Sequence, residues 1–169
     1  KKLFNGQTAP VGEVGREGVL EKLEPLLQKD CIVCCIDQGG DKRMTEYKPY
    51  DNEKYGASEG KEYVDFLTQT LKPFIDAKYR TLRDAEHTFI AGSSMGALIS
   101  LYAVMQYPQV FGSAGIFSPS LLLTPQMDDD MKKINFKTHP HFYFYAGGKE
   151  SETMVSDMQK IEKIINEKK

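Results

Sequence analysis

The sequence lacks any apolar run approaching the roughly 20 residues that a helix needs to cross a bilayer, so we expect no association with a membrane. It also lacks an excess of one charge, because 22 Lys and Arg against 24 Asp and Glu leave a net charge of −2. No basic stripe is interleaved with aromatic residues, which argues against nucleic acid as a partner. There is no internal repeat, no low-complexity linker and no cluster of metal-ligating residues, so we expect no cofactor and no metal.

Cysteine is scarce, with Cys31, Cys34 and Cys35 grouped in "DCIVCCID". An odd number without a disulfide framework fits a reducing compartment and favours a cytoplasmic location. The chain opens abruptly at Lys1, however, so a removed signal peptide stays open. Cys31 and Cys34 form a C-x-x-C, but they lie inside an apolar run where a redox pair would need a turn. We expect the three cysteines to be buried in a strand.

The chain does contain apolar periods that alternate between strand and helix spacing. Helical periods predict helices over 18–29, from about Ser58, over 95–108 and over 151–169. Strands are expected at 31–37, 87–92, 112–117 and 141–146. This alternation predicts a single α/β domain over 1–169, with a mostly parallel sheet covered by helices on both faces. In such sheets ligands bind at the carboxyl ends of the strands.

The segment "FIAGSSMGAL" places Gly92-Ser93-Ser94-Met95-Gly96, a G-x-S-x-G, between an apolar strand and an apolar helix. This context is required for a nucleophile elbow, in which the central serine stands in a strained turn at the edge of the sheet. Ser94 is therefore the candidate nucleophile, and Ser93 a spacer. The two glycines are expected to avoid collisions with the neighbouring strand and helix. The backbone N–H of Met95, at the helix start, is the candidate oxyanion donor.

Four segments in this order resemble the putative-esterase branch of the α/β-hydrolases, which includes enterochelin, feruloyl and acetylxylan esterases and esterase D. They are the elbow, "GGDKRMTEYKPY" (similar to an R-x-x-E-Y-x-P loop), "FSPSLL", and "FYFYAGGKES". The resemblance implies an α/β-hydrolase core and a serine esterase. It also implies that the first strands and the last strand of that core are missing, since "LFNGQTAP" is similar to the stretch just after the family's D-G-Q-N motif, whose neighbourhood supplies a second oxyanion donor.

In this superfamily the acid of the catalytic triad follows a late strand, and the resemblance assigns it to Glu150. Glu152 is the alternative, and both glutamates can instead simply begin the last helix. The histidine presents a difficulty. His87 begins the strand that leads to Ser94 and should lie roughly 20 Å from it. His139 and His141 likewise precede their strand, so we expect the catalytic histidine in a segment beyond Lys169.

The mouth of the site is expected to include Arg43, Glu46 and Tyr47, whose loop leaves the carboxyl end of a strand. Arg43 would suit an anionic or hydroxyl-rich substrate, although a loop this charged can equally be solvated surface. Ser118 is a weaker substrate-binding candidate at the same edge. The leading hypothesis is a carboxylic-ester hydrolase with a small-molecule ester substrate. An acyltransferase of the same fold, and a binding domain that has lost the chemistry, remain as alternatives.

Overall fold

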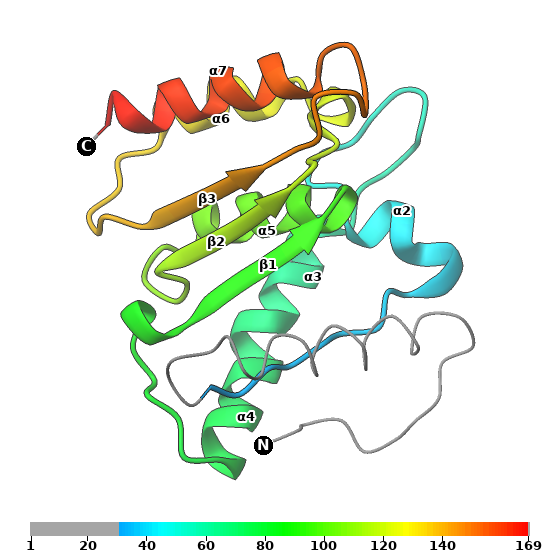
Figure 1. Ribbon diagram of the computed structural model, residues 1–169. Coiled ribbons are helices and arrows are strands. Elements are labelled where there is room, and N and C mark those ends of the chain that lie inside the picture. The colour runs from blue at the N-terminus through cyan, green and yellow to red at the C-terminus, as the bar shows by residue number, and fades with distance from the viewer. Residues whose placement is uncertain (1–30, 169) are drawn as a thin grey trace. The chain divides into compact units, whose positions relative to one another are not determined.

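The computed structural model describes residues 31–168, and its chain divides into two compact units, Lys1–Gln38 and Gly39–Lys169 (Figure 1). The predicted helix at 18–29 and the stretch "LFNGQTAP" lie outside the described residues. The helices and strands that the structure describes all belong to the second unit. None of these helices has both the length and the apolar character that a bilayer span requires.

The second unit begins with short helical turns and continues as alternating helices and strands. In chain order these elements are η2 (Gly40–Lys42), α2 (Arg43–Glu46), α3 (Gly60–Phe66), the π-helical η3 (Leu67–Leu71), α4 (Lys72–Lys78), η4 (Ala85–His87), β1 (Phe89–Ser93), α5 (Met95–Gln106), β2 (Ser113–Phe117), η5 (Leu121–Leu123), α6 (Gln126–Lys133), β3 (His141–Tyr145) and α7 (Met154–Asn166).

In the described part of the chain the three strands form one parallel sheet in the order β1-β2-β3. Its register pairs Phe89 with Ser113 and Ser113 with His141 at one end. At the other end it pairs Ser93 with Phe117 and Phe117 with Tyr145. The arrowheads in Figure 1 therefore all point to one edge, where the residues that follow the strands come together. The predicted α/β class with a parallel sheet is confirmed.

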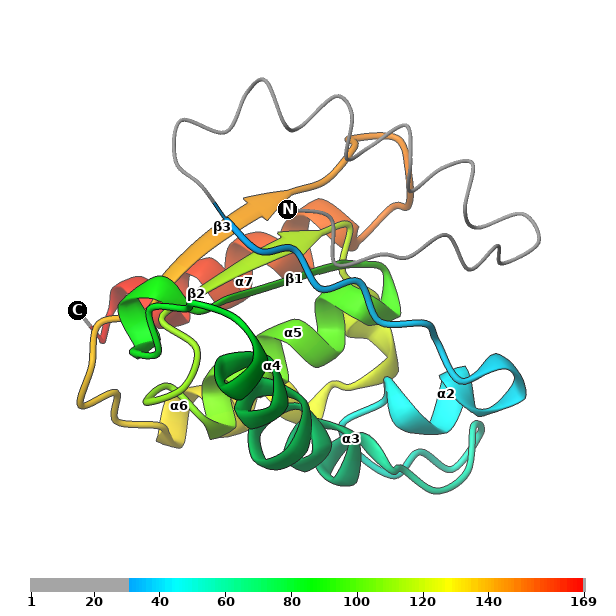
Figure 2. The same ribbon diagram turned by 90° about the horizontal axis from the view of Figure 1, so that it is seen from below.

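The core of this unit lies between the sheet and α5. Leu98, Leu101 and Val104 of α5 are fully buried, as is Ile116 of β2. A helix that is apolar on all sides must be covered on all sides, and α5 packs against β1, β2 and α3. Figure 2 shows α3, α4 and α5 on the same side of the strands. This packing fixes the start of α5, and with it the turn that follows β1.

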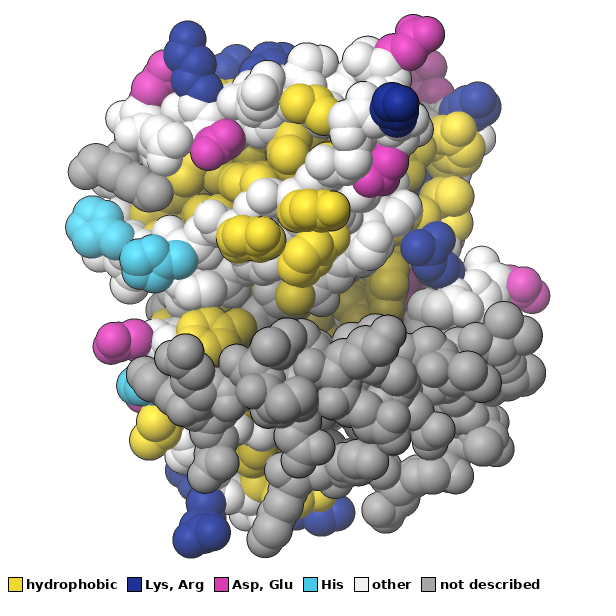
Figure 3. All heavy atoms as spheres, in the orientation of Figure 1, with side chains coloured by type: hydrophobic (Ala, Val, Ile, Leu, Met, Phe, Trp, Pro, Cys, Tyr) yellow, Lys and Arg dark blue, Asp and Glu magenta, His cyan; other side chains and the backbone are white. Residues whose placement is uncertain are grey.

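The opposite face of the sheet carries large exposed side chains. Phe89 is 66% exposed and Tyr143 is 62% exposed, although each lies on a strand. Figure 3 shows apolar side chains gathered over the strands on this face. Alternate residues of a strand face opposite sides of the sheet, so the burial pattern of β1 and β3 alternates in step.

The predicted strand at 31–37 is wrong, because residues 31–39 form neither helix nor strand. The expectation of buried cysteines fails with it: Cys31 and Cys34 are exposed and Cys35 is half-buried. An apolar, β-branched run indicates where a strand would be stable, but a strand exists only where a neighbour accepts and donates its backbone hydrogen bonds.

The helix predicted from Ser58 begins at Gly60, where the Ser58 hydroxyl accepts a hydrogen bond from the Gly60 N–H at 3.1 Å. The helical conformation then changes at η3, a π-helical segment. A π-helix advances by a different angle per residue, so a stripe spaced for an α-helix does not stay on one side. Phe66 before this segment and Phe74 after it are 43% and 55% exposed, whereas Leu67 is buried.

Candidate active site

The candidate site lies at the edge of the sheet where the three strands end. Because Ser93, Phe117 and Tyr145 are in register, the next residues along each strand meet at this edge. Ser94 follows β1 and Ser118 follows β2. The segment after β3 contains Glu150. The tertiary structure thus brings together three side chains that the sequence spreads over 57 positions, from 94 to 150.

Ser94 has an unusual backbone conformation, with φ 59° and ψ −120°. Residues other than glycine rarely adopt a positive φ, so the backbone of this turn is strained. A nucleophile elbow has the same kind of strained turn. The flanking structure holds the strain in place. The Ser94 N–H donates to the Phe117 carbonyl at 3.0 Å, and the Ser94 carbonyl accepts from the Leu98 N–H at 3.2 Å in the first turn of α5.

The two glycines of the elbow have different roles. A Cβ at Gly92 would collide with the backbone of Gly96, so the close approach of β1 to α5 requires glycine at position 92. A Cβ at Gly96 would meet nothing within 4 Å outside its own helix. The expected collision is therefore confirmed for Gly92 and wrong for Gly96, whose Cβ direction points away from the strand.

The Ser94 hydroxyl lies 3.0 Å from the Ser120 hydroxyl, with either oxygen able to donate. Met95 follows Ser94 and opens α5, where the first backbone N–H groups have no partner within the helix. The Met95 side chain is 3% exposed, so the start of α5 is firmly packed.

The Glu150 carboxylate is fixed at the same edge. Its Oε1 accepts a hydrogen bond from the Ser118 hydroxyl at 2.9 Å and another from the Gly147 N–H at 2.6 Å. Glu152 is exposed and has neither contact. Of the two glutamates weighed from the sequence, Glu150 is the one held against the residue that follows β2.

Arg43 approaches the elbow from α2. Its Nη1 lies 3.6 Å from the sulfur of Met95, and its guanidinium lies 6.0 Å from the centre of the Tyr47 ring. The Tyr47 ring packs in turn on Tyr63, with ring centres 5.0 Å apart. The Glu46 carboxylate lies against Gly39, where it fills the space that a side chain at that position would take. The structure thus brings Arg43 beside the residue after Ser94, supported by aromatic rings.

The three histidines of the sequence lie at the opposite edge. His87 closes η4 just before β1, and His141 is the first residue of β3, preceded by His139. Figure 3 shows histidine side chains on the side where the strands begin. His87 Nδ1 is 2.7 Å from Asp84, and this hydrogen bond lowers the pKa of the Asp84 carboxyl. Each of the three histidines thus precedes or begins a strand, whereas Ser94 follows one.

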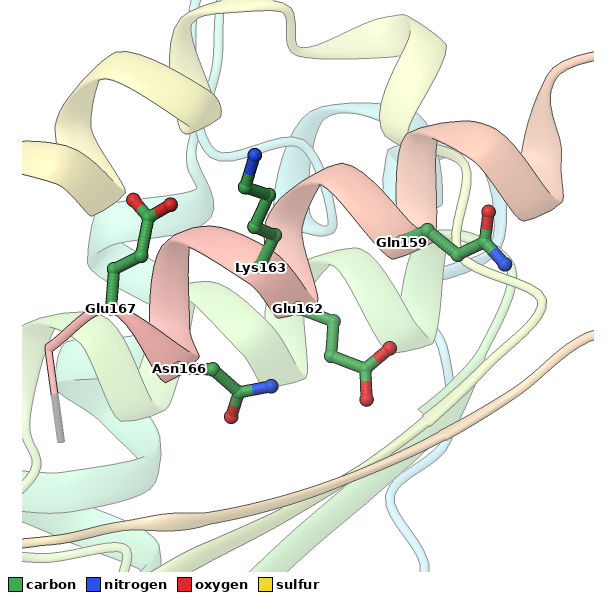
Figure 4. A pocket seen from close by; sticks show the side chains of 5 residues that line it. All are labelled: Gln159, Glu162, Lys163, Asn166 and Glu167. Atoms are coloured by element: carbon green, nitrogen blue, oxygen red, sulfur yellow. The ribbon is translucent and has the colours of Figure 1, made fainter.

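The other surface features lie away from these residues. A shallow hollow along α7 is lined by Gln159, Glu162, Lys163 and Asn166 of that helix and by Glu167, which follows it (Figure 4). A second, small one lies near His139 and Phe142, at the edge where β3 begins. Within residues 31–168 no three His, Cys, Asp or Glu side chains gather as they would around a metal ion.

Sequence patterns alone did not predict the contact of Ser120 with Ser94. The signal was present in "FSPSLL", because the residues after β2 must reach the edge where Ser94 stands. Which of the two serines faces Ser94 depends on the turn at Ser118, whose φ is 46°. A positive φ at a serine has no sequence signature, so the assignment needed the fold.

Comparisons with known proteins agree with this arrangement. The family described as "Putative esterase" matches residues 20–155. The "Uncharacterized protein YjcH" of Bacillus subtilis (strain 168) is 28% identical over 153 residues, which cover 87% of this chain and 58% of YjcH. The chain thus spans less than two thirds of that relative.

Two solved structures share the fold at low sequence identity. The BES protein from Bacillus cereus gives a TM-score of 0.62 at 17% identity, over 94% of this chain and 71% of that one. The siderophore hydrolase EstA from Aspergillus nidulans gives 0.59 at 16% identity, over 92% of this chain and 63% of that one.

Proposed function

The chain belongs to the putative esterase family, and we propose that the full-length protein is a serine carboxylic-ester hydrolase that works through an acyl-enzyme on Ser94. The observation that carries the proposal is the strained backbone of Ser94, at φ 59°, between the end of β1 and the buried start of α5. A chain keeps strain of this kind, which costs about 1–3 kcal/mol, where the surrounding structure enforces it, and such residues cluster at reactive sites.

The chemistry follows from the hydroxyl at the helix start. A base takes the Ser94 proton while Oγ attacks the carbonyl carbon of the ester, and the carbonyl oxygen becomes an oxyanion that accepts a hydrogen bond from the Met95 N–H. The alcohol leaves with the proton from the base. Water then attacks the acyl-enzyme by the same route, which releases the carboxylic acid and restores Ser94.

Glu150 is proposed as the residue that orients the base. It lies at the same edge of the sheet as Ser94, and two hydrogen bonds already fix its carboxylate. The base itself is proposed to come from outside this sequence, because its three histidines lie at the other edge of the sheet. The greater length of YjcH supports this.

The substrate is proposed to carry an anionic or hydroxyl-rich group. Arg43 supports this, because its guanidinium lies beside Met95 and, within the described residues, makes no ion pair with a carboxylate. Tyr47 and Ser118 complete the proposed mouth. EstA is named a siderophore hydrolase, so a siderophore ester is a reasonable first substrate to assay beside simple aryl esters.

Covalent labelling tests the proposal. A fluorophosphonate should modify Ser94 in the full-length protein, and Ser94→Ala should abolish both labelling and ester turnover. Ser93→Ala is the matched control, because Ser93 is adjacent but belongs to β1. An adduct on any other serine would overturn the assignment. Absence of labelling in a folded protein would favour a binding domain, and acyl transfer to added alcohols in place of hydrolysis would favour an acyltransferase.

A further inference from the structure

The segment between the two proposed catalytic side chains touches both of them. Ser120 contacts the Ser94 hydroxyl and Ser118 contacts the Glu150 carboxylate, with only Pro119 between the two serines. We propose that Ser118-Pro119-Ser120 is a positioning segment that sets the nucleophile and the acid in place relative to one another. This inference rests on the proposed function and adds two residues with separate positioning roles.

Ser120 interacts with Ser94 through two groups, its hydroxyl and its backbone N–H. Besides the 3.0 Å approach of the hydroxyls, the Ser120 N–H donates to the Ser94 carbonyl at 3.3 Å. Either hydroxyl can donate in this pair; in the proposed role Ser120 is the donor to Ser94 Oγ, so that the Ser94 hydrogen is free to point at the base. A hydrogen bond to an oxygen that gains charge becomes stronger as the proton leaves, so Ser120 favours the attacking form of Ser94.

On the acid side, Ser118 donates to Oε1 of Glu150 together with the Gly147 N–H. A carboxylate on a surface segment keeps a single orientation only where donors hold it. The Ser118 N–H also donates to the Tyr145 carbonyl at 2.7 Å, so the same residue ties the end of β2 to the end of β3. The orientation of Glu150 therefore depends on the position of Ser118.

The segment itself is rigid. Pro119 is fully buried and its ring restricts φ, and Ser118 has a positive φ of 46°. The Leu123 N–H donates to the Ser120 carbonyl at 3.1 Å. Asn52 Nδ2 then donates to the Leu123 carbonyl at 3.1 Å, which anchors the turn after Ser120 to the loop that follows α2. Moving either serine would thus disturb the other.

Steady-state kinetics and labelling rates of the full-length protein test the Ser120 role. Ser120→Ala should lower kcat and the rate of fluorophosphonate labelling about tenfold, since one hydrogen bond to a charge-bearing group is lost, while KM changes little. Ser120→Thr keeps a hydroxyl and should recover most of the rate. Ser113→Ala is the control, because Ser113 opens the same strand at the far edge. All variants should unfold at nearly the same temperature.

A double-mutant cycle tests the Ser118 role. Ser118→Ala should lower kcat about tenfold in the wild-type background but less than about twofold when Glu150 is already alanine, because Ser118 acts through that carboxylate. A purely structural role would give equal losses in both backgrounds, which would overturn this half of the inference.

The remaining outcomes separate this inference from the proposed function. If Ser94→Ala keeps its activity, the proposed function fails. If Ser94→Ala is inactive but Ser118→Ala and Ser120→Ala behave like Ser113→Ala, the enzyme stands and the positioning segment is refuted. A Ser120→Thr variant as slow as Ser120→Ala would likewise refute a role for the hydroxyl.

Discussion

The hydroxyl oxygens of Ser94 and Ser120 lie 3.0 Å apart across 26 positions of sequence. This contact joins the turn after β1 to the turn after β2, and it exists because parallel strands in register end at one edge. The side chain proposed as the nucleophile is therefore held both by the strain of its own backbone and by a neighbour on the next strand.

The backbone strain at Ser94 is expected to lower the free energy of unfolding, and glycine at this position should relieve it. In urea unfolding, the free energy of unfolding of Ser94→Gly should be about 1 kcal/mol higher than that of Ser94→Ala, because glycine adopts a positive φ without steric cost. Ser100 within α5 is the control position. There the Ser100→Gly variant should be less stable than Ser100→Ala by about 1 kcal/mol. Equal stability of the two Ser94 variants would show that the turn stores no strain.

The two glycines of the elbow should respond in opposite ways to alanine. Gly92→Ala should destabilise the chain by about 2 kcal/mol or more, since its Cβ would meet the backbone of Gly96, which cannot move without shifting α5. Gly96→Ala should be neutral or slightly stabilising, because alanine favours the helix and the space is open. Thermal unfolding of both variants is the measurement, and a reversed order would contradict the geometry of the elbow.

The choice between the two glutamates can be made by kinetics. In the full-length protein Glu150→Gln should lower kcat by orders of magnitude with little change in unfolding temperature, because a base that loses its orienting acid is held in the wrong form. Glu152→Gln is the matched control and should be mild, since Glu152 makes neither of the two hydrogen bonds that hold the Glu150 carboxylate. The opposite ranking would move the acid to Glu152.

The 169-residue chain alone is expected to be nearly inactive. No histidine of the sequence reaches Ser94, and the loss of the base costs a serine hydrolase a factor of about a million. Its turnover of p-nitrophenyl acetate should therefore match that of its own Ser94→Ala variant. Turnover at least tenfold above that variant would mean that a histidine does reach Ser94, with His139 and His141 the first to replace.

Several features could be read from the sequence because local chemistry encodes them. The strands at 87–92, 112–117 and 141–146 lie within a residue or two of β1, β2 and β3, since short apolar runs bounded by turn residues favour strands. The elbow was recognisable because a G-x-S-x-G between a strand and a helix has few other structural uses. The place of the histidines at the start of strands followed from the chain order of the apolar runs alone.

Other features were decided by tertiary structure. The run at 31–37 has the composition of a strand, yet a strand needs a hydrogen-bonded neighbour, which composition does not reveal. The π-helical segment Leu67–Leu71 likewise has no signal in the apolar spacing of the sequence. Above all, the pairing of Ser120 with Ser94 and of Ser118 with Glu150 depends on strand register and on one positive φ. Residue type and spacing were enough to name candidate site residues, because they are local properties of the chain. Which of these residues touch one another followed from the fold, because contacts between distant positions arise from packing.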